Sequence, residues 1–106
     1  MSAVATAIPV DQDAIARFCR NWGIRELALF GSVLTDEFRP DSDVDVLITF
    51  ADQQPDLGPW GERLDVMREE LERIFGRRVD LVQKKLVRNP FRRHHILKTR
   101  RIIYAA

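Results

Sequence analysis

The sequence predicts a small α/β domain in which a mixed sheet of three or four strands is flanked by helices. Three observations lead to this prediction. Segments with helix-like spacing of apolar residues alternate with short continuous apolar runs, Gly and Pro residues separate these segments, and 106 residues suffice for one domain with a modest core. We expect a loose leader over residues 1–10 and a single domain over residues 11–106.

Helix boundaries are marked by capping residues. Asp11 suits the N-cap of a first helix, and Gly23 suits its end, because Gly adopts the left-handed conformation at low cost. Asn89 followed by Pro90 suits the N-cap and first position of the last helix. The predicted helices cover about residues 12–22, 32–37, 61–75 and 90–101.

Short apolar runs predict three strands, at residues 27–30, 43–50 and 78–82. Side chains at alternate positions of a strand share one face. Asp43 and Asp45 should therefore lie side by side on one face of their strand, while the Val and Ile residues between and after them fill the core.

Three acidic residues in these strands are the candidate catalytic and metal-binding residues. Asp43 and Asp45 would repel each other unless a cation lay between them. Asp80 points away from the core face of its own strand, so it can reach the same place if the two strands are neighbours. The alternative is a strand that opens at a solvated edge and carries incidental acids.

A Gly-Ser pair precedes the acidic strand. Gly31 would let a phosphate approach the backbone, and Ser32 could donate its hydroxyl to a phosphate oxygen at the start of a helix. The alternative for this pair is a simple helix cap. Together with three convergent carboxylates, the pair favours a phosphoryl-transfer site that uses two metal ions.

The spacing of these residues resembles a known signature. The arrangement of Gly31-Ser32, ten further residues and Asp43-Val44-Asp45 is similar to that of the DNA polymerase beta-like nucleotidyltransferases. The flanking residues, the later Val-Asp-Leu-Val at Asp80 and the chain ending from Asn89 to Tyr104 resemble the minimal nucleotidyltransferase branch. The resemblance spans about residues 23–104.

The resemblance implies a role for each matching residue. Gly31 and Ser32 would bind the triphosphate of ATP, and Asp43 and Asp45 would contact both the nucleotide and two magnesium ions. Asp80 would bind the catalytic metal ion and help to deprotonate the attacking hydroxyl.

The resemblance also implies a partner. Members of this branch resemble antitoxins of HEPN-domain ribonuclease toxins, and some transfer AMP to a tyrosine of the toxin. The chain departs from many relatives at Val33 and Thr35, where they have arginines, and at Asp36. This departure keeps open the alternative of an antitoxin that neutralises its toxin by binding alone.

The net charge is only +1, but every charged residue from Lys84 to Arg101 is basic. This run could be a solvated helix face, or it could contact an acidic partner protein or RNA. Interleaved Ile and Leu residues at positions 96, 97, 102 and 103 favour a protein contact, and direct nucleic-acid binding is not expected.

We expect a cytoplasmic protein. The single cysteine, Cys19, lies on the apolar side of the first helix and suits a buried position in a reducing compartment. No apolar stretch approaches the roughly 20 residues that a membrane span needs. Residues 1–10 lack the features of a signal peptide.

Overall fold

The computed structural model describes residues 8–106, so residues 1–7 of the predicted leader lie outside the described part. It confirms an α/β fold with one mixed four-stranded sheet, in the order β3-β2-β1-β4. Strands β2 and β3 are parallel, and the other neighbouring pairs are antiparallel. The strands are β1 (Ile24–Phe30), β2 (Val44–Phe50), β3 (Val79–Gln83) and β4 (Arg101–Ala105). The helices are α1 (Gln12–Trp22), α2 (Glu62–Phe75) and α3 (Pro90–Thr99), with 3₁₀ turns η1 (Gly31–Leu34) and η2 (Lys84–Leu86).

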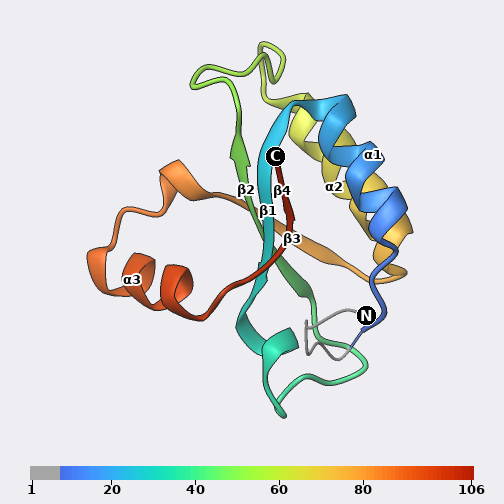
Figure 1. Ribbon diagram of the computed structural model, residues 1–106, viewed down its shortest axis with the longest axis vertical. Helices are drawn as coiled ribbons and strands as arrows, with labels where there is room; N and C mark the ends of the chain where they lie inside the picture. The colour runs from blue at the N-terminus through green and yellow to red at the C-terminus, as the bar shows by residue number, and fades with distance from the viewer. Residues whose placement is uncertain (1–7) are drawn as a thin grey trace.

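The helices divide between the two sides of the sheet. Figure 1 shows α1 and α2 together on one side and α3 on the other. The larger apolar cluster lies under α1 and α2 and includes Val44, Val46 and Ile48 of β2, as the alternation predicted. A smaller cluster lies under α3, where Leu47 of β2 joins Ile96 of the helix. We call this second side the α3 face.

The capping predictions are confirmed. The Asp11 carboxylate accepts a hydrogen bond from the Ala14 N–H at 3.1 Å. The Asn89 side chain accepts from the N–H groups of both Phe91 and Arg92, at 3.0 and 3.1 Å. These bonds satisfy donors that a helix leaves unpaired in its first turn, which is why Asp and Asn fix where the helices begin.

The prediction that the last helix reaches about Arg101 is wrong. Helix α3 ends at Thr99, the chain turns at Arg100, and β4 pairs antiparallel with the free edge of β1. The apolar residues after Arg100 include two β-branched isoleucines, which favour a strand. The Arg100 guanidinium holds the junction, because its Nε lies 3.0 Å from the Glu26 carboxylate and both side chains are only 19% exposed.

Two residues that we expected to anchor a partner belong to the core instead. Ile96 and Ile103 are 5% and 7% exposed, so the intramolecular clusters account for them. Ile8 is also buried, which extends the packed core into the range predicted as a leader. Cys19 is fully buried as expected, and its burial raises the pKa of the thiol to about 12. Within residues 8–106, every helix is too short or too polar to cross a bilayer.

Candidate functional site

Asp45 and Asp80 are direct neighbours on the two parallel strands. Their Cα atoms are register partners of the β2–β3 pair. Register partners in a parallel sheet project their side chains to the same side, so both carboxylates lie on the α3 face. The expected proximity of these two residues is therefore present at the start of both strands.

Gly31 lies directly against the Asp45 carboxylate. Its φ of 77° is in the left-handed region, and a Cβ atom at this position would lie 2.3 Å from Asp45 Oδ2. The register of β1 and β2 makes this contact, since Phe30 is the partner of Asp45 and Gly31 follows it. Both the backbone conformation and the space therefore require glycine beside this carboxylate.

Asp43 immediately precedes β2, and its carboxylate forms an ion pair with Arg78. Arg78 Nε lies 3.1 Å from Asp43 Oδ1, and the same guanidinium donates to the carbonyl of Asp41 at 3.3 Å. The two paired side chains are 49% and 76% exposed. Such solvent-exposed pairs contribute about 0–1 kcal/mol, so a stronger ligand for Asp43 could displace Arg78.

The surroundings of Asp45 disfavour its negative charge. Burial raises the pKa of the Asp45 carboxyl, and the nearby charges of Asp80 and Asp43 raise it further. The positive charge of Arg92 acts in the opposite sense and lowers the pKa of Asp45. A carboxylate that is partly desolvated and flanked by two others is relieved most strongly by a cation.

Among residues 8–106, no group of three or more acidic, histidine or cysteine side chains is arranged as a finished cation site. The donor chemistry nevertheless fits magnesium, which prefers carboxylate oxygens and retains several waters rather than needing a full protein cage. Two carboxylates, those of Asp45 and Asp80, already share one face. The third, that of Asp43, is held by an exposed ion pair.

The Gly-Ser turn differs from the prediction of a helix over residues 32–37. Gly31–Leu34 forms only one 3₁₀ turn, so the dipole of a full helix is not available to a phosphate. Ser32 is half-buried, and its carbonyl accepts from the Thr35 hydroxyl at 2.9 Å. Val33 is only 1% exposed and belongs to the core. Val33 and Thr35, at which the resemblance implies arginine, therefore have packing and turn roles here.

Arg78 and Arg92 are charged residues near the site that we did not predict to be part of it. Arg92 was expected to join Arg93 in contacting a partner. Arg93 instead donates to the carbonyls of Lys84 and Val87, at 2.7 and 3.2 Å, and so fixes α3 to η2. The Asn89 cap could have indicated the place of Arg92, because it assigns this residue to the first turn of the helix.

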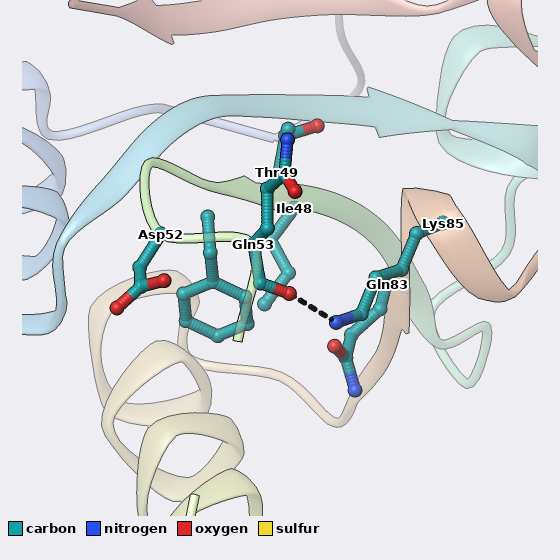
Figure 2. A pocket seen from close by; sticks show the side chains of 7 residues that line it. Ile48, Thr49, Asp52, Gln53, Gln83 and Lys85 are labelled. Carbon is teal, nitrogen blue, oxygen red and sulfur yellow. Dashed lines mark hydrogen bonds between the residues drawn. The ribbon is translucent and has the colours of Figure 1, made fainter. Parts of the chain in front are cut away.

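A separate pocket of about 360 Å³ lies at the other end of the parallel strands. Ile48, Thr49 and Gln83 help to line it, and Lys85 Nζ donates to the Gln53 carbonyl at 2.9 Å across its rim (Figure 2). It lies four residues along β2 from Asp45, which is about 13 Å in a strand. Because none of the three aspartates lines this pocket, we do not assign it to the carboxylate site.

Known proteins are similar to this chain in sequence and in fold. A family profile described as "nucleotidyltransferase domain" matches residues 12–103. The protein adenylyltransferase MntA of Thermococcus cleftensis is 40% identical over 68 residues, which is 64% of this chain and 64% of that protein. The alignment thus spans just under two thirds of the curated relative.

Solved structures add to these similarities. One, provisionally assigned as a minimal nucleotidyltransferase, has a TM-score of 0.67 and 29% identity, covering 85% of this chain and 86% of its own. Another, the tri-AMPylated Shewanella oneidensis HEPN toxin in complex with MNT antitoxin, has a TM-score of 0.58 and 18% identity. It covers 90% of this chain and 70% of its own, and this level of identity shows the fold alone. Since the family profile spans nearly the whole described domain, the chain belongs to the nucleotidyltransferase domain family.

Proposed function

We propose that this protein is a metal-dependent antitoxin that transfers AMP from ATP to a tyrosine hydroxyl of a HEPN ribonuclease toxin. The observation that carries the proposal is the in-register placement of Asp45 beside Asp80, with Gly31 packed against Asp45. Family membership and the adenylyltransferase relative support the type of reaction. The choice of partner follows the complex of an MNT antitoxin with a HEPN toxin, whose structure has the same fold.

Each site residue has a defined task in this proposal. Asp43, Asp45 and Asp80 would hold two magnesium ions, and Gly31 and Ser32 would contact the triphosphate. When bound, the metal ions would neutralise charge on the phosphates and align the attack. The acceptor oxygen forms a bond to the α-phosphorus, and the bond from that phosphorus to the bridging oxygen breaks, so that pyrophosphate leaves. Asp80, which is exposed at the site, would take the proton of the attacking hydroxyl.

Asp45→Asn tests the proposal, because Asn keeps the shape of the side chain but removes its charge. We expect transfer of label from α-labelled ATP to the partner to fall by roughly 10²-fold or more, a transition-state loss of about 3 kcal/mol. The partner complex should persist, since the substitution changes only the charge of a half-buried residue beside the carboxylates. The partner treated with wild type should gain the mass of one or more AMP groups.

Asp41→Asn is the matched control. It removes the same charge from an exposed residue in the preceding turn, outside the three-carboxylate set, so transfer should stay near the wild-type rate. If wild type and Asp45→Asn neutralise the partner equally well, and neither changes its mass, the transferase proposal fails.

The second candidate is an antitoxin that acts by binding alone. It is favoured by Val33 and Thr35, because neither position supplies the positive charge that arginine would bring to a triphosphate. A buried valine and a hydroxyl that bonds to the turn cannot do so. The result that refutes the transferase proposal, equal neutralisation with no mass change, is the one that this candidate requires.

A further inference from the structure

Helix α3 packs on the face of the sheet that carries the carboxylates (Figure 1). Ile96 of α3 belongs to the same buried cluster as Leu47 of β2 and Phe30 of β1. Phe30 is the register partner of Asp45, and Leu47 lies two residues after Asp45. Phe30, Asp45 and Leu47 therefore share the α3 face. The helix is therefore anchored immediately beside the site.

Arg92 lies in the first turn of α3. It precedes Ile96 by four residues, which places the two side chains on one face of the helix, one turn apart. The buried Ile96 fixes this face toward the sheet. The Asn89 cap and the bonds from Arg93 to η2 fix where the helix begins.

Arg92 is exposed, and within residues 8–106 its guanidinium forms no hydrogen bond or ion pair. Three other arginines are engaged: Arg78 pairs with Asp43, Arg93 bonds to backbone carbonyls, and Arg100 pairs with Glu26. The charge of Arg92 is close enough to Asp45 to act on it. Within the described part of the chain, Arg92 is thus a cation near the site without a fixed partner.

We propose that Arg92 binds the phosphate groups of the nucleoside triphosphate and supplies the positive charge that Val33 and Thr35 lack. The inference rests on the proposed nucleotidyl transfer. A guanidinium can donate two parallel hydrogen bonds to phosphate oxygens, which an ammonium group cannot do. Because it comes from α3, it would approach the triphosphate from the side opposite to the sheet, whereas Gly31 and Ser32 lie at the end of β1.

The test is the affinity for ATP with magnesium, measured by calorimetry on wild type, Arg92→Ala, Arg92→Lys and Lys98→Ala. The last is a matched control, because Lys98 is an exposed cation on the same helix, six residues or about 9 Å further along. We expect Arg92→Ala to weaken ATP binding about tenfold or more and Arg92→Lys to weaken it less. Lys98→Ala should stay within about twofold of wild type, and adenosine affinity should be the same in all four proteins.

Any other outcome overturns the inference, and the outcomes can be told apart. If Arg92→Ala binds ATP as wild type does, Arg92 is not a phosphate ligand, while the proposed function stands. If it loses ATP and adenosine equally and unfolds at a lower temperature, its role is structural. If its only effect is tighter binding of magnesium alone, Arg92 merely neutralises Asp45. If wild type itself does not bind ATP with magnesium, the proposed function fails as well.

Discussion

Asp45→Asn should stabilise the metal-free protein at neutral pH, although it should abolish transfer. The ionised carboxylate is partly desolvated and lies beside Asp80 and Asp43, so the fold carries an unfavourable charge there. Asparagine fills the same space without that charge. A residue that destabilises the fold but is suited to holding a cation is what we expect of a functional site.

The size of the effect follows from the sheet geometry. Adjacent strands are about 5 Å apart, and two unit charges at that separation repel by roughly 1 kcal/mol in water and about 3 kcal/mol at an effective dielectric of about 20. Asp80 is exposed, so we take the lower figure. The attraction of Arg92 for Asp45 opposes the repulsion but is the smallest of the contributions. A gain of about 1 kcal/mol would raise the melting temperature by roughly 4 °C or more in a domain of this size.

The gain should depend on pH in a defined direction. The pKa of the Asp45 carboxyl is raised in the folded protein, so the folded state binds this proton more tightly than the unfolded state. The stability that this provides is present below the ordinary pKa of an aspartic acid and is lost as pH rises through the raised value. Wild type and Asp45→Asn should therefore be closest in stability in acid, and the variant should gain its advantage as pH increases toward neutrality.

Thermal unfolding in a chelator, followed by circular dichroism across this pH range, measures the difference. Asp41→Asn is again the control, because it removes an exposed charge with little expected effect. Adding magnesium should raise the melting temperature of wild type more than that of Asp45→Asn and so narrow the gap. An Asp45→Asn protein that is less stable than wild type at neutral pH, in the absence of metal, would refute this account of the electrostatics.

Two further predictions concern packing. Gly76, at the end of α2, has a left-handed φ of 69° and so resembles Gly31 in its backbone conformation. Gly31→Ala and Gly76→Ala should therefore each destabilise the fold by roughly 1–2 kcal/mol through left-handed backbone strain. Gly31→Ala should lose about 1 kcal/mol more stability than Gly76→Ala, because its new Cβ would meet the Asp45 carboxylate, whereas the space beside Gly76 is open. Denaturant titration measures both losses, and equal losses would contradict the contact between Gly31 and Asp45. Cys19 should resist alkylation at pH 8, because a thiol with a pKa of about 12 is buried and ionised in only about one molecule in 10⁴. Alkylation of Cys19 should therefore be as slow as unfolding, and rapid alkylation of the native protein would contradict the burial of this thiol.

Most of the fold could be predicted from sequence, because its signals are local. The caps at Asp11 and Asn89 each act within one helical turn, and the alternation in β2 is a property of adjacent residues. The fourth strand was missed because its partner is distant in sequence. Residues 101–105 have an apolar pattern that a helix end could also carry, and the free edge of β1 decides between the two.

The candidate site was predictable to the extent that its residues share a strand. Asp43 and Asp45 are two residues apart, so a strand places both on one face of the sheet. The pairing of Asp45 with Asp80, in contrast, depends on the β2–β3 register. The ion pair of Arg78 with Asp43 and the proximity of Arg92 to Asp45 depend on how separate elements pack. Sequence patterns do not specify those distances, so the basic run was interpreted as a single surface although its members have different roles.

The position of the acidic residues explains how one sheet can be both a stable core and a site. On the α3 face, β2 passes from the half-buried Asp45 to the buried Leu47 within two residues. Leu47 and Ile96 hold α3 in place, and the same helix carries Arg92 toward Asp45. The apolar contact therefore helps to hold a cation near carboxylates that repel one another, before any ligand is bound. A triphosphate with magnesium would satisfy both sets of charges at once, because the carboxylates would bind the metal ions and Arg92 would bind the phosphates. Binding should consequently strengthen the attachment of α3 to the sheet, and amide hydrogen exchange in residues 90–99 should slow when ATP and magnesium are added to wild type but not to Arg92→Ala.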